Sequence, residues 1–110
     1  MKRLISSLKE KKRYIAFEID SESGLNKSDV IKAVDDSCRG FIGEYGYGKA
    51  GVMVVNDTVN GEKGVVRVDS KYVDMVKISL GMIREINKTK VAFRNVKTSG
   101  ALGKVKQKGG

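Results

Sequence analysis

Residues 14–24 open with a hydrophobic repeat of period two. Three apolar residues alternate with small or acidic ones, namely Ile15, Phe17 and Ile19. This alternation predicts a β-strand with one buried face, and the polar segment 21–24 ends it. Phe17 shares the face of Ile15 and Ile19, so we expect it in the core.

The following segment changes to helical spacing. Its apolar residues recur every three or four positions: Val30, Val34, Cys38 and Phe41. They predict a helix over about 27–42 that buries this face. Asn26 is placed to cap its N-terminus, with Asp29 completing a box-like pair, and Gly43 ends it.

The second half of the chain repeats strand and helix signals. Two β-rich runs, 52–56 and 65–69, flank a polar connection that contains the turn pair Asn60-Gly61, which predicts an antiparallel hairpin. Ser70 is placed to cap a second helix, with Gly81 inside it allowing close packing on the sheet. The expected buried face of that helix is Tyr72, Val76, Leu80, Ile83 and Ile86. A strand over 91–96 follows, and the glycine-rich stretch 43–51 reads as a flexible helix-to-strand loop.

This β-α-β-β-α-β order predicts an α+β fold of the ferredoxin-like, RNA-recognition-module-like type. Such a sandwich has an antiparallel sheet with both helices on one face. The 110 residues suit a single domain. We expect a basic lead-in over 1–12, in which residues 4–8 are compatible with a short extra helix, a core over 13–100, and a frayed basic tail over 101–110.

Charge is concentrated at the two ends of the chain. Residues 1–13 hold six basic residues and one acid, residues 86–110 hold seven basic residues and no acid, and the net charge is +9. A near-neutral middle between two basic ends favours a polyanionic partner, with solvated termini as the alternative. A membrane partner is not predicted, because neither end has the strong amphipathic apolar face or the lipidation signal that membrane binding needs.

The sequence offers little material for catalysis. It has no histidine, and its single cysteine, Cys38, lies on the apolar face of the predicted helix. Asp35 and Asp36 are adjacent on that helix and so point about 100° apart, which does not make a metal-binding pair. No catalytic residue, metal site or cofactor is therefore predicted. Lacking a membrane-spanning run and a secretory signal, the chain is expected in the cytoplasm.

Aromatic residues give two further expectations. In an RNA-recognition module the third strand carries aromatic rings, but the run 63–70 has valine, arginine and aspartate at those positions. Tyr14 in the first strand could stack on a base, yet base stacking across the sheet is not predicted. Tyr45 and Tyr47, two residues apart, are expected to project together as a protein contact.

Five segments carry a resemblance to a known family: residues 8–12, 13–19, 43–46, 64–73 and 91–100. In this order they resemble the archaeal ribonuclease P protein component 2 family, although residues 101–104 replace a more polar continuation. The resemblance implies a ferredoxin-like subunit of the ribonucleoprotein that removes the 5′ leader from precursor tRNA. It also implies that magnesium held by the RNA does the chemistry, and that the chain pairs with protein component 3 as a dimer of heterodimers.

Basic residues are the expected RNA contacts, because they would neutralise phosphates where RNA strands crowd together. The candidates are Lys9, Lys11, Lys12, Arg13, Arg67, Lys71, Arg94, Lys97, Lys104 and Lys106. The first and last strands of a ferredoxin-like sheet are neighbours, so we expect both basic groups to share one edge of the sheet. For Arg67 and Lys71 an ion pair with Asp69 or Asp74 is an equal alternative.

Two other functions stay open. One is a stand-alone basic protein that binds ribosomal or transfer RNA. The other is a small ferredoxin-like hydrolase of the acylphosphatase type, which needs an arginine in a phosphate loop near the first strand. The segment 21–24 has no arginine, which disfavours the hydrolase.

Overall fold

The computed structural model describes residues 11–100. Five strands form one antiparallel sheet in the order β2-β3-β1-β5-β4. The strands are β1 (Lys12–Ser21), β2 (Met53–Val54), β3 (Lys63–Asp69), β4 (Glu85–Ile86) and β5 (Thr89–Ser99). The first four positions reproduce the predicted ferredoxin-like order, and the short β4 extends the sheet beyond β5.

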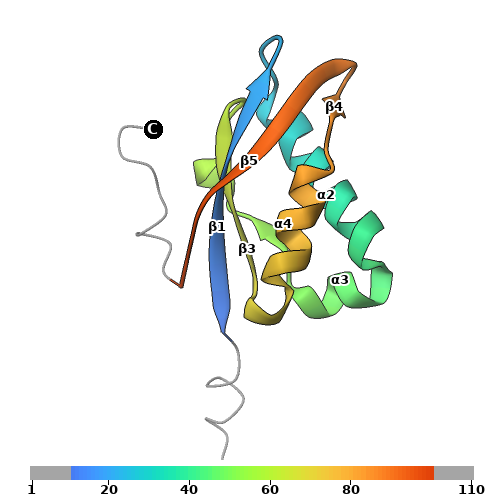
Figure 1. Cartoon of the computed structure of the whole chain (residues 1–110), viewed down its shortest axis with the longest axis vertical. Helices are drawn as coiled ribbons and strands as arrows, with labels where there is room; N and C mark the ends of the chain where they lie inside the picture. Colours follow the sequence, from blue (N-terminus) through green and yellow to red (C-terminus); the bar gives the residue numbers. More distant parts are fainter. Residues whose placement is uncertain (1–10, 101–110) are drawn as a thin grey trace, which may run out of the picture.

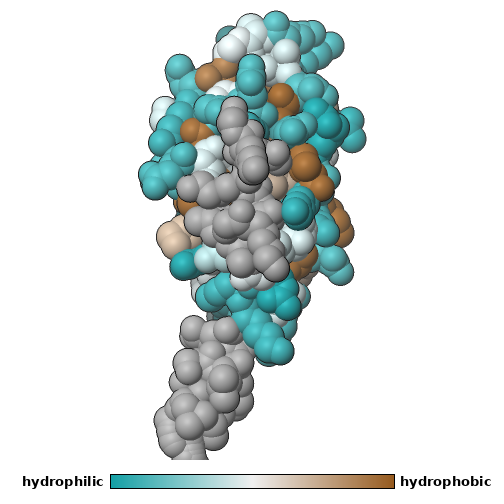
Figure 2. Space-filling model, turned by 90° about the vertical axis from the view of Figure 1, so that its left-hand side faces the viewer, coloured by the Kyte–Doolittle hydropathy of each residue, from teal (hydrophilic) through white to brown (hydrophobic). Residues whose placement is uncertain are grey.

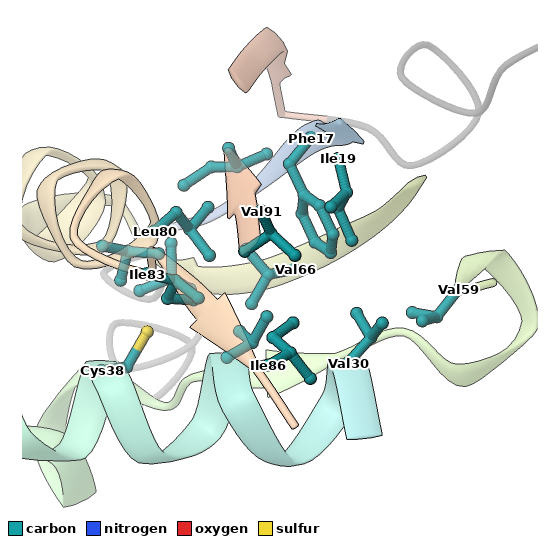
Figure 3. Packing of buried hydrophobic residues seen from close by; sticks show 14 of the residues in the cluster. Phe17, Ile19, Val30, Cys38, Val59, Val66, Leu80, Ile83, Ile86 and Val91 are labelled. Atoms are coloured by element: carbon teal, nitrogen blue, oxygen red, sulfur yellow. The ribbon is translucent and has the colours of Figure 1, made fainter. Parts of the chain in front are cut away.

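Helices cover one face of this sheet (Figure 1). They are α2 (Lys27–Ile42), α3 (Glu44–Ala50) and α4 (Val73–Gly81), with 3₁₀ turns at Asn56–Thr58 and Ser70–Tyr72. The core lies between the helices and the sheet (Figure 3). As predicted, Ile15, Phe17 and Ile19 point into it, and the Phe17 and Phe93 rings lie 5.3 Å apart.

The glycine-rich stretch 43–51 is the largest departure from prediction, because most of it forms α3 instead of a loop. Gly43 adopts a φ of 90°, which separates α3 from α2. Ala50 is fully buried, and Tyr47 packs against the core. Burial of these two residues outweighs the poor helix propensity of the glycines, a property that the local sequence does not show.

The caps of the two long helices also differ from prediction. Asn26 occupies the N-cap position of α2, and its carbonyl accepts the first helical hydrogen bonds, but its side chain makes no cap. The side-chain amide instead donates to Asp29 Oδ2 at 3.3 Å. Ser70 does not cap α4, since Asp69 Oδ1 accepts from the Lys71 backbone N–H at 2.9 Å and caps the turn before it.

The second predicted helix is shorter than expected. Helix α4 ends at Gly81, which is exposed and has no neighbour close enough to require a glycine there. Ile83 and Ile86 still enter the core, but from the turn after α4 and from β4. Phe41, in the last turn of α2, was predicted on the buried face but is 40% exposed.

The predicted hairpin is confirmed in its pairing, with a shorter first strand. Strand β2 has only two residues, which pair with β3 before the chain enters the turn at Asn56–Thr58. Asn60 Oδ1 accepts backbone hydrogen bonds from Glu62 and Lys63 at 2.7 and 3.0 Å, which fixes the predicted turn. The predicted lead-in helix and the basic tail beyond residue 100 lie outside the described residues.

Candidate nucleic-acid interface

Basic residues gather where β1 begins and where β3 and β5 end. Antiparallel pairing sets Lys12 opposite Asp69 and Tyr14 opposite Ser99, so three distant segments meet at one end of the sheet. We call this surface the basic end. It consists of Lys11, Lys12, Arg13, Arg67, Lys71 and Lys97. Six of the ten predicted RNA contacts are thereby brought together.

The neighbouring strands place the basic groups at an end of the sheet, not at an edge. Strand β1 is the central strand between β3 and β5, so the predicted shared edge was wrong. Two close approaches show the convergence. The Arg13 guanidinium lies beside Gly100, where an added Cβ would be 3.4 Å from Nη1, and the Lys12 ammonium lies equally close to Gly51.

The Lys12 ammonium lies at the C-terminal end of helix α3. Gly51 is the C-cap of α3, in the left-handed conformation with a φ of 61°. A helix C-terminus carries partial negative charge, so the ammonium of Lys12 stabilises it. Lys12 contributes to the positive potential of the basic end while also holding α3 to the sheet.

Arg67 and Lys71 form no ion pair with Asp69 or Asp74 among residues 11–100. Asp69 contacts Lys71 only through the backbone N–H. The Nε of Arg67 is buried and has no hydrogen-bond partner. The structure thus removes the ion-pair alternative for these two residues and leaves their charges available.

Arg94 lies apart from the basic end and is paired. Its guanidinium is 3.0 Å from Glu18 Oε1 and 3.2 Å from Asp20 Oδ2. The hydrogen bond to Asp20, the charge of Asp20 and the charge of Glu18 all raise the pKa of Arg94 above its ordinary value. A phosphate at this position would have to compete with two carboxylates. Lys9, Lys104 and Lys106 lie outside the described residues.

One basic residue of the helix-free face lies outside both the predicted RNA contacts and the basic end. Strand β3 begins at Lys63, two residues before the predicted run, and Lys63 lies opposite Glu18. It lines a shallow polar groove together with Glu18, Asp20 and Arg94. The period-two alternation of Lys63, Val65 and Arg67 was the signal that could have found it.

Tyr45 and Tyr47 do not project together, because α3 turns them to different sides. Tyr45 is 78% exposed, and the Lys49 ammonium lies 4.9 Å from its ring centroid. The hydroxyl of Tyr47 donates to Asp35, and the Arg39 guanidinium lies 4.7 Å from its ring centroid. Of the predicted pair, only Tyr45 is open to a protein partner.

The two adjacent aspartates of α2 are both paired with basic residues. Asp35 and Asp36 pair with Arg39 and Lys32 along α2. Within residues 11–100, no group of three or more carboxylate, cysteine or histidine side chains is arranged to hold a metal ion. Over the same residues, no helix is long and apolar enough to cross a membrane.

Cys38 is fully buried, and burial raises the pKa of its thiol to about 11 from an ordinary value of 9.0. As pH rises, the thiol of the unfolded chain ionises before the buried thiol of the folded chain. The stability that the buried thiol contributes is therefore complete below pH 9 and is lost as pH rises through about 11. Each pKa unit corresponds to about 1.4 kcal/mol. We expect the wild-type chain to lose about 2 kcal/mol more stability between pH 8 and pH 11 than Cys38→Ala.

Urea unfolding of both proteins at the two pH values measures this difference, and the alanine variant cancels the titration of lysines and tyrosines. Equal losses in the two proteins would show that the Cys38 thiol ionises as easily in the native state as in the unfolded one.

Together, these features define a class of protein: a small ferredoxin-like α+β fold with cations gathered at one end of its sheet, none of them ion-paired within residues 11–100. The family model described as Rpp14/Pop5 family matches residues 13–109. The chain belongs to the Rpp14/Pop5 family.

Similarity to known proteins supports this family assignment. Ribonuclease P protein component 2 of Thermococcus kodakarensis is 35% identical over 107 residues, which are 97% of this chain and 89% of that protein. The component 2 proteins of Pyrococcus furiosus and Methanosarcina mazei are 33% and 32% identical, over 97% and 98% of this chain and 89% and 91% of theirs. A chain in the cryo-EM structure of yeast ribonuclease MRP shares the fold, with a TM-score of 0.67, 13% identity, and coverage of 84% of this chain and 76% of that one.

Proposed function

We propose that this chain is a non-catalytic protein subunit of ribonuclease P that binds the RNase P RNA and supports removal of the 5′ leader from precursor tRNA. Membership of the Rpp14/Pop5 family and near full-length similarity to component 2 proteins support this role. The structural observation that carries it is the basic end, where six cations converge without forming an ion pair in residues 11–100.

The basic end suits contact with the sugar–phosphate backbone. Lys11 and Lys71 are exposed, and Lys97 lies on the outer surface of β5. Cations at such positions displace counterions from RNA and lower the repulsion between strands that fold close together. The protein would thereby favour the active RNA fold and substrate docking, while magnesium held by the RNA performs the cleavage and no cofactor binds to this chain.

We further propose protein partners on the model of the family. The chain pairs with ribonuclease P protein component 3, and the pair assembles as a dimer of heterodimers in the cytoplasm. Tyr45 is our candidate for a protein contact, since its ring is largely exposed at the surface of α3. Exposed tyrosines of this kind are favoured at protein interfaces.

The two alternatives have less support. A hydrolase of the acylphosphatase type needs a free arginine near the end of β1, and the arginine that lies there, Arg94, is paired with Glu18 and Asp20. A stand-alone RNA-binding protein shares the chemistry of the basic end but predicts no preference for one structured RNA. Selectivity therefore separates it from the proposed subunit role.

Competition binding measures that selectivity. Labelled RNase P RNA is bound by the full chain at several salt concentrations and displaced with unlabelled RNase P RNA or with ribosomal RNA of equal nucleotide content. We expect RNase P RNA to compete at least tenfold better at every salt concentration. Equal competition would support the stand-alone protein and contradict the subunit role.

A further inference from the structure

One row of residues crosses the helix-free face of the sheet at its basic end. Pairing of four strands aligns Met53 on β2, Arg67 on β3, Tyr14 on β1 and Ser99 on β5. Figure 2 views the molecule from this side, where the described surface is largely hydrophilic with scattered hydrophobic residues. Tyr14 and Arg67 are directly opposite each other, and the side chains of such pairs lie about 5 Å apart at Cβ.

Tyr14 is anchored but not enclosed. It packs against Ala16 and Val65, which are each 2% exposed and form a small apolar cluster separate from the main core. Tyr14 itself is only half-buried. An aromatic residue that is held in place and still reaches solvent is a ready platform for stacking, because little side-chain entropy is lost when a ligand binds.

Arg67 has an unmet need for a hydrogen-bond acceptor. Its Nε is buried without a partner, and its guanidinium forms no ion pair among the described residues. A buried donor without an acceptor is costly, and no acceptor within residues 11–100 ties the Arg67 Nε in place. The planar guanidinium matches the two oxygens of a phosphate.

We propose that Tyr14 and Arg67 together bind one unpaired nucleotide of the RNA. The base stacks on the Tyr14 ring, and the Arg67 guanidinium donates hydrogen bonds to the phosphate of the same nucleotide. Lys97, opposite Ala16 in the neighbouring row, adds positive charge beside that phosphate. Paired bases are stacked on each other and cannot reach the ring, so the site selects single-stranded positions.

This site is unlike the base-stacking surface of an RNA-recognition module. It uses one ring from β1, and β3 contributes a guanidinium where that module has an aromatic residue. Stacking is tolerant of base identity, so the site recognises an unpaired nucleotide, not a sequence. The inference rests on the proposed function, since it names the kind of RNA position that the subunit contacts.

Binding of the full-length chain to RNase P RNA, measured across salt concentrations, tests the proposal with four variants. Tyr14→Ala is expected to bind roughly 5- to 150-fold more weakly with an unchanged salt dependence, because stacking involves no phosphate. Tyr14→Phe is expected to keep the affinity. Arg67→Gln is expected to lower the slope of log K against log salt by about one, whereas Arg67→Lys keeps the slope but binds more weakly.

Lys63→Gln is the matched control for Arg67→Gln. Lys63 lies on the same strand and the same face as Arg67 but outside the row, and its replacement removes the same charge. It is expected to change affinity less than threefold. A second readout locates the contact: RNase P RNA containing 4-thiouridine is crosslinked by light, and the crosslinked peptide is identified by mass spectrometry. We expect it to contain Tyr14, and the crosslink to be lost in Tyr14→Ala.

Unchanged affinity in Tyr14→Ala with selective binding by the wild-type chain would overturn this inference and leave the proposed function standing. A crosslink at other residues would also overturn this inference. Equal losses of RNA affinity in Tyr14→Ala and Tyr14→Phe would do the same. If the wild-type chain showed no preference for RNase P RNA, the proposed function would fail, and this inference with it. If Tyr14→Ala is found unfolded by circular dichroism, the Tyr14→Phe, Arg67→Lys and crosslinking results decide between these outcomes.

Discussion

Replacing Lys11, Lys12 and Arg13 together by alanine is expected to weaken binding to RNase P RNA by roughly 100- to 500-fold at 0.1 M salt. Each lost phosphate contact lowers the slope of log K against log salt by about 0.7 on single strands and 0.9 on duplexes. Three contacts therefore lower it by about two to three. These residues enter β1 at the basic end, and none of them forms an ion pair in residues 11–100.

A matched triple variant separates this effect from loss of net charge. Lys27, Arg84 and Lys90 are exposed at the opposite end of the sheet, where β1 ends and β4 and β5 meet. Their replacement by alanine removes the same charge and is expected to lower the slope by less than one. Equal slopes for the two triple variants, with native circular dichroism spectra for both, would show that the basic end is not the RNA-binding surface.

Replacing Phe17 by alanine is expected to lower the free energy of unfolding by about 3–5 kcal/mol, the usual cost of removing a buried aromatic ring. Phe17 is 1% exposed and packs on Phe93. It also fills the space over Gly64, where an added Cβ would lie 2.8 Å from Phe17 Cζ and 2.9 Å from Val59 Cγ2. The ring therefore joins β1, β3 and β5 in one contact.

Urea unfolding of Phe17→Ala measures this loss in the free energy of unfolding, with Val96→Ala as the control. Val96 is 44% exposed on β5, so its truncation is expected to cost under about 1 kcal/mol. A domain of this size has a total stability of about 5–15 kcal/mol, so the Phe17 variant should show a clearly lower urea midpoint. Similar midpoints for the two variants would contradict the placement of Phe17 at the centre of the core.

Hydrophobic spacing predicted the fold because each long element carries its own pattern. The alternation around Phe17 and the helical repeat of Val30, Val34 and Cys38 both reappear as buried faces. Helix α3 could not be predicted this way, since its glycines oppose a helix, and the contacts that stabilise it, such as the burial of Ala50 and Tyr47 against the core, come from the tertiary structure. The early end of α4 likewise depends on β4 pairing with β5.

The sequence predicted that basic residues form the candidate site, but it did not show which of them are ion-paired in the fold. Basic residues near both ends of the chain indicated a polyanion, and the neighbouring first and last strands brought several of them together. Arg94 shows what the sequence could not reveal. A register shift after Ala16 sets Arg94 opposite Glu18, and this pairing across 76 positions joins it to carboxylates instead of the basic end.

Reconstitution of ribonuclease P tests the central claim most directly. RNase P RNA, protein component 3 and a precursor tRNA are combined at moderate magnesium concentration, with and without this chain, and release of the 5′ leader is followed. We predict cleavage with the complete set and little or none when this chain is omitted. Equal cleavage in its absence would contradict the subunit role and leave a general RNA-binding protein as the better description.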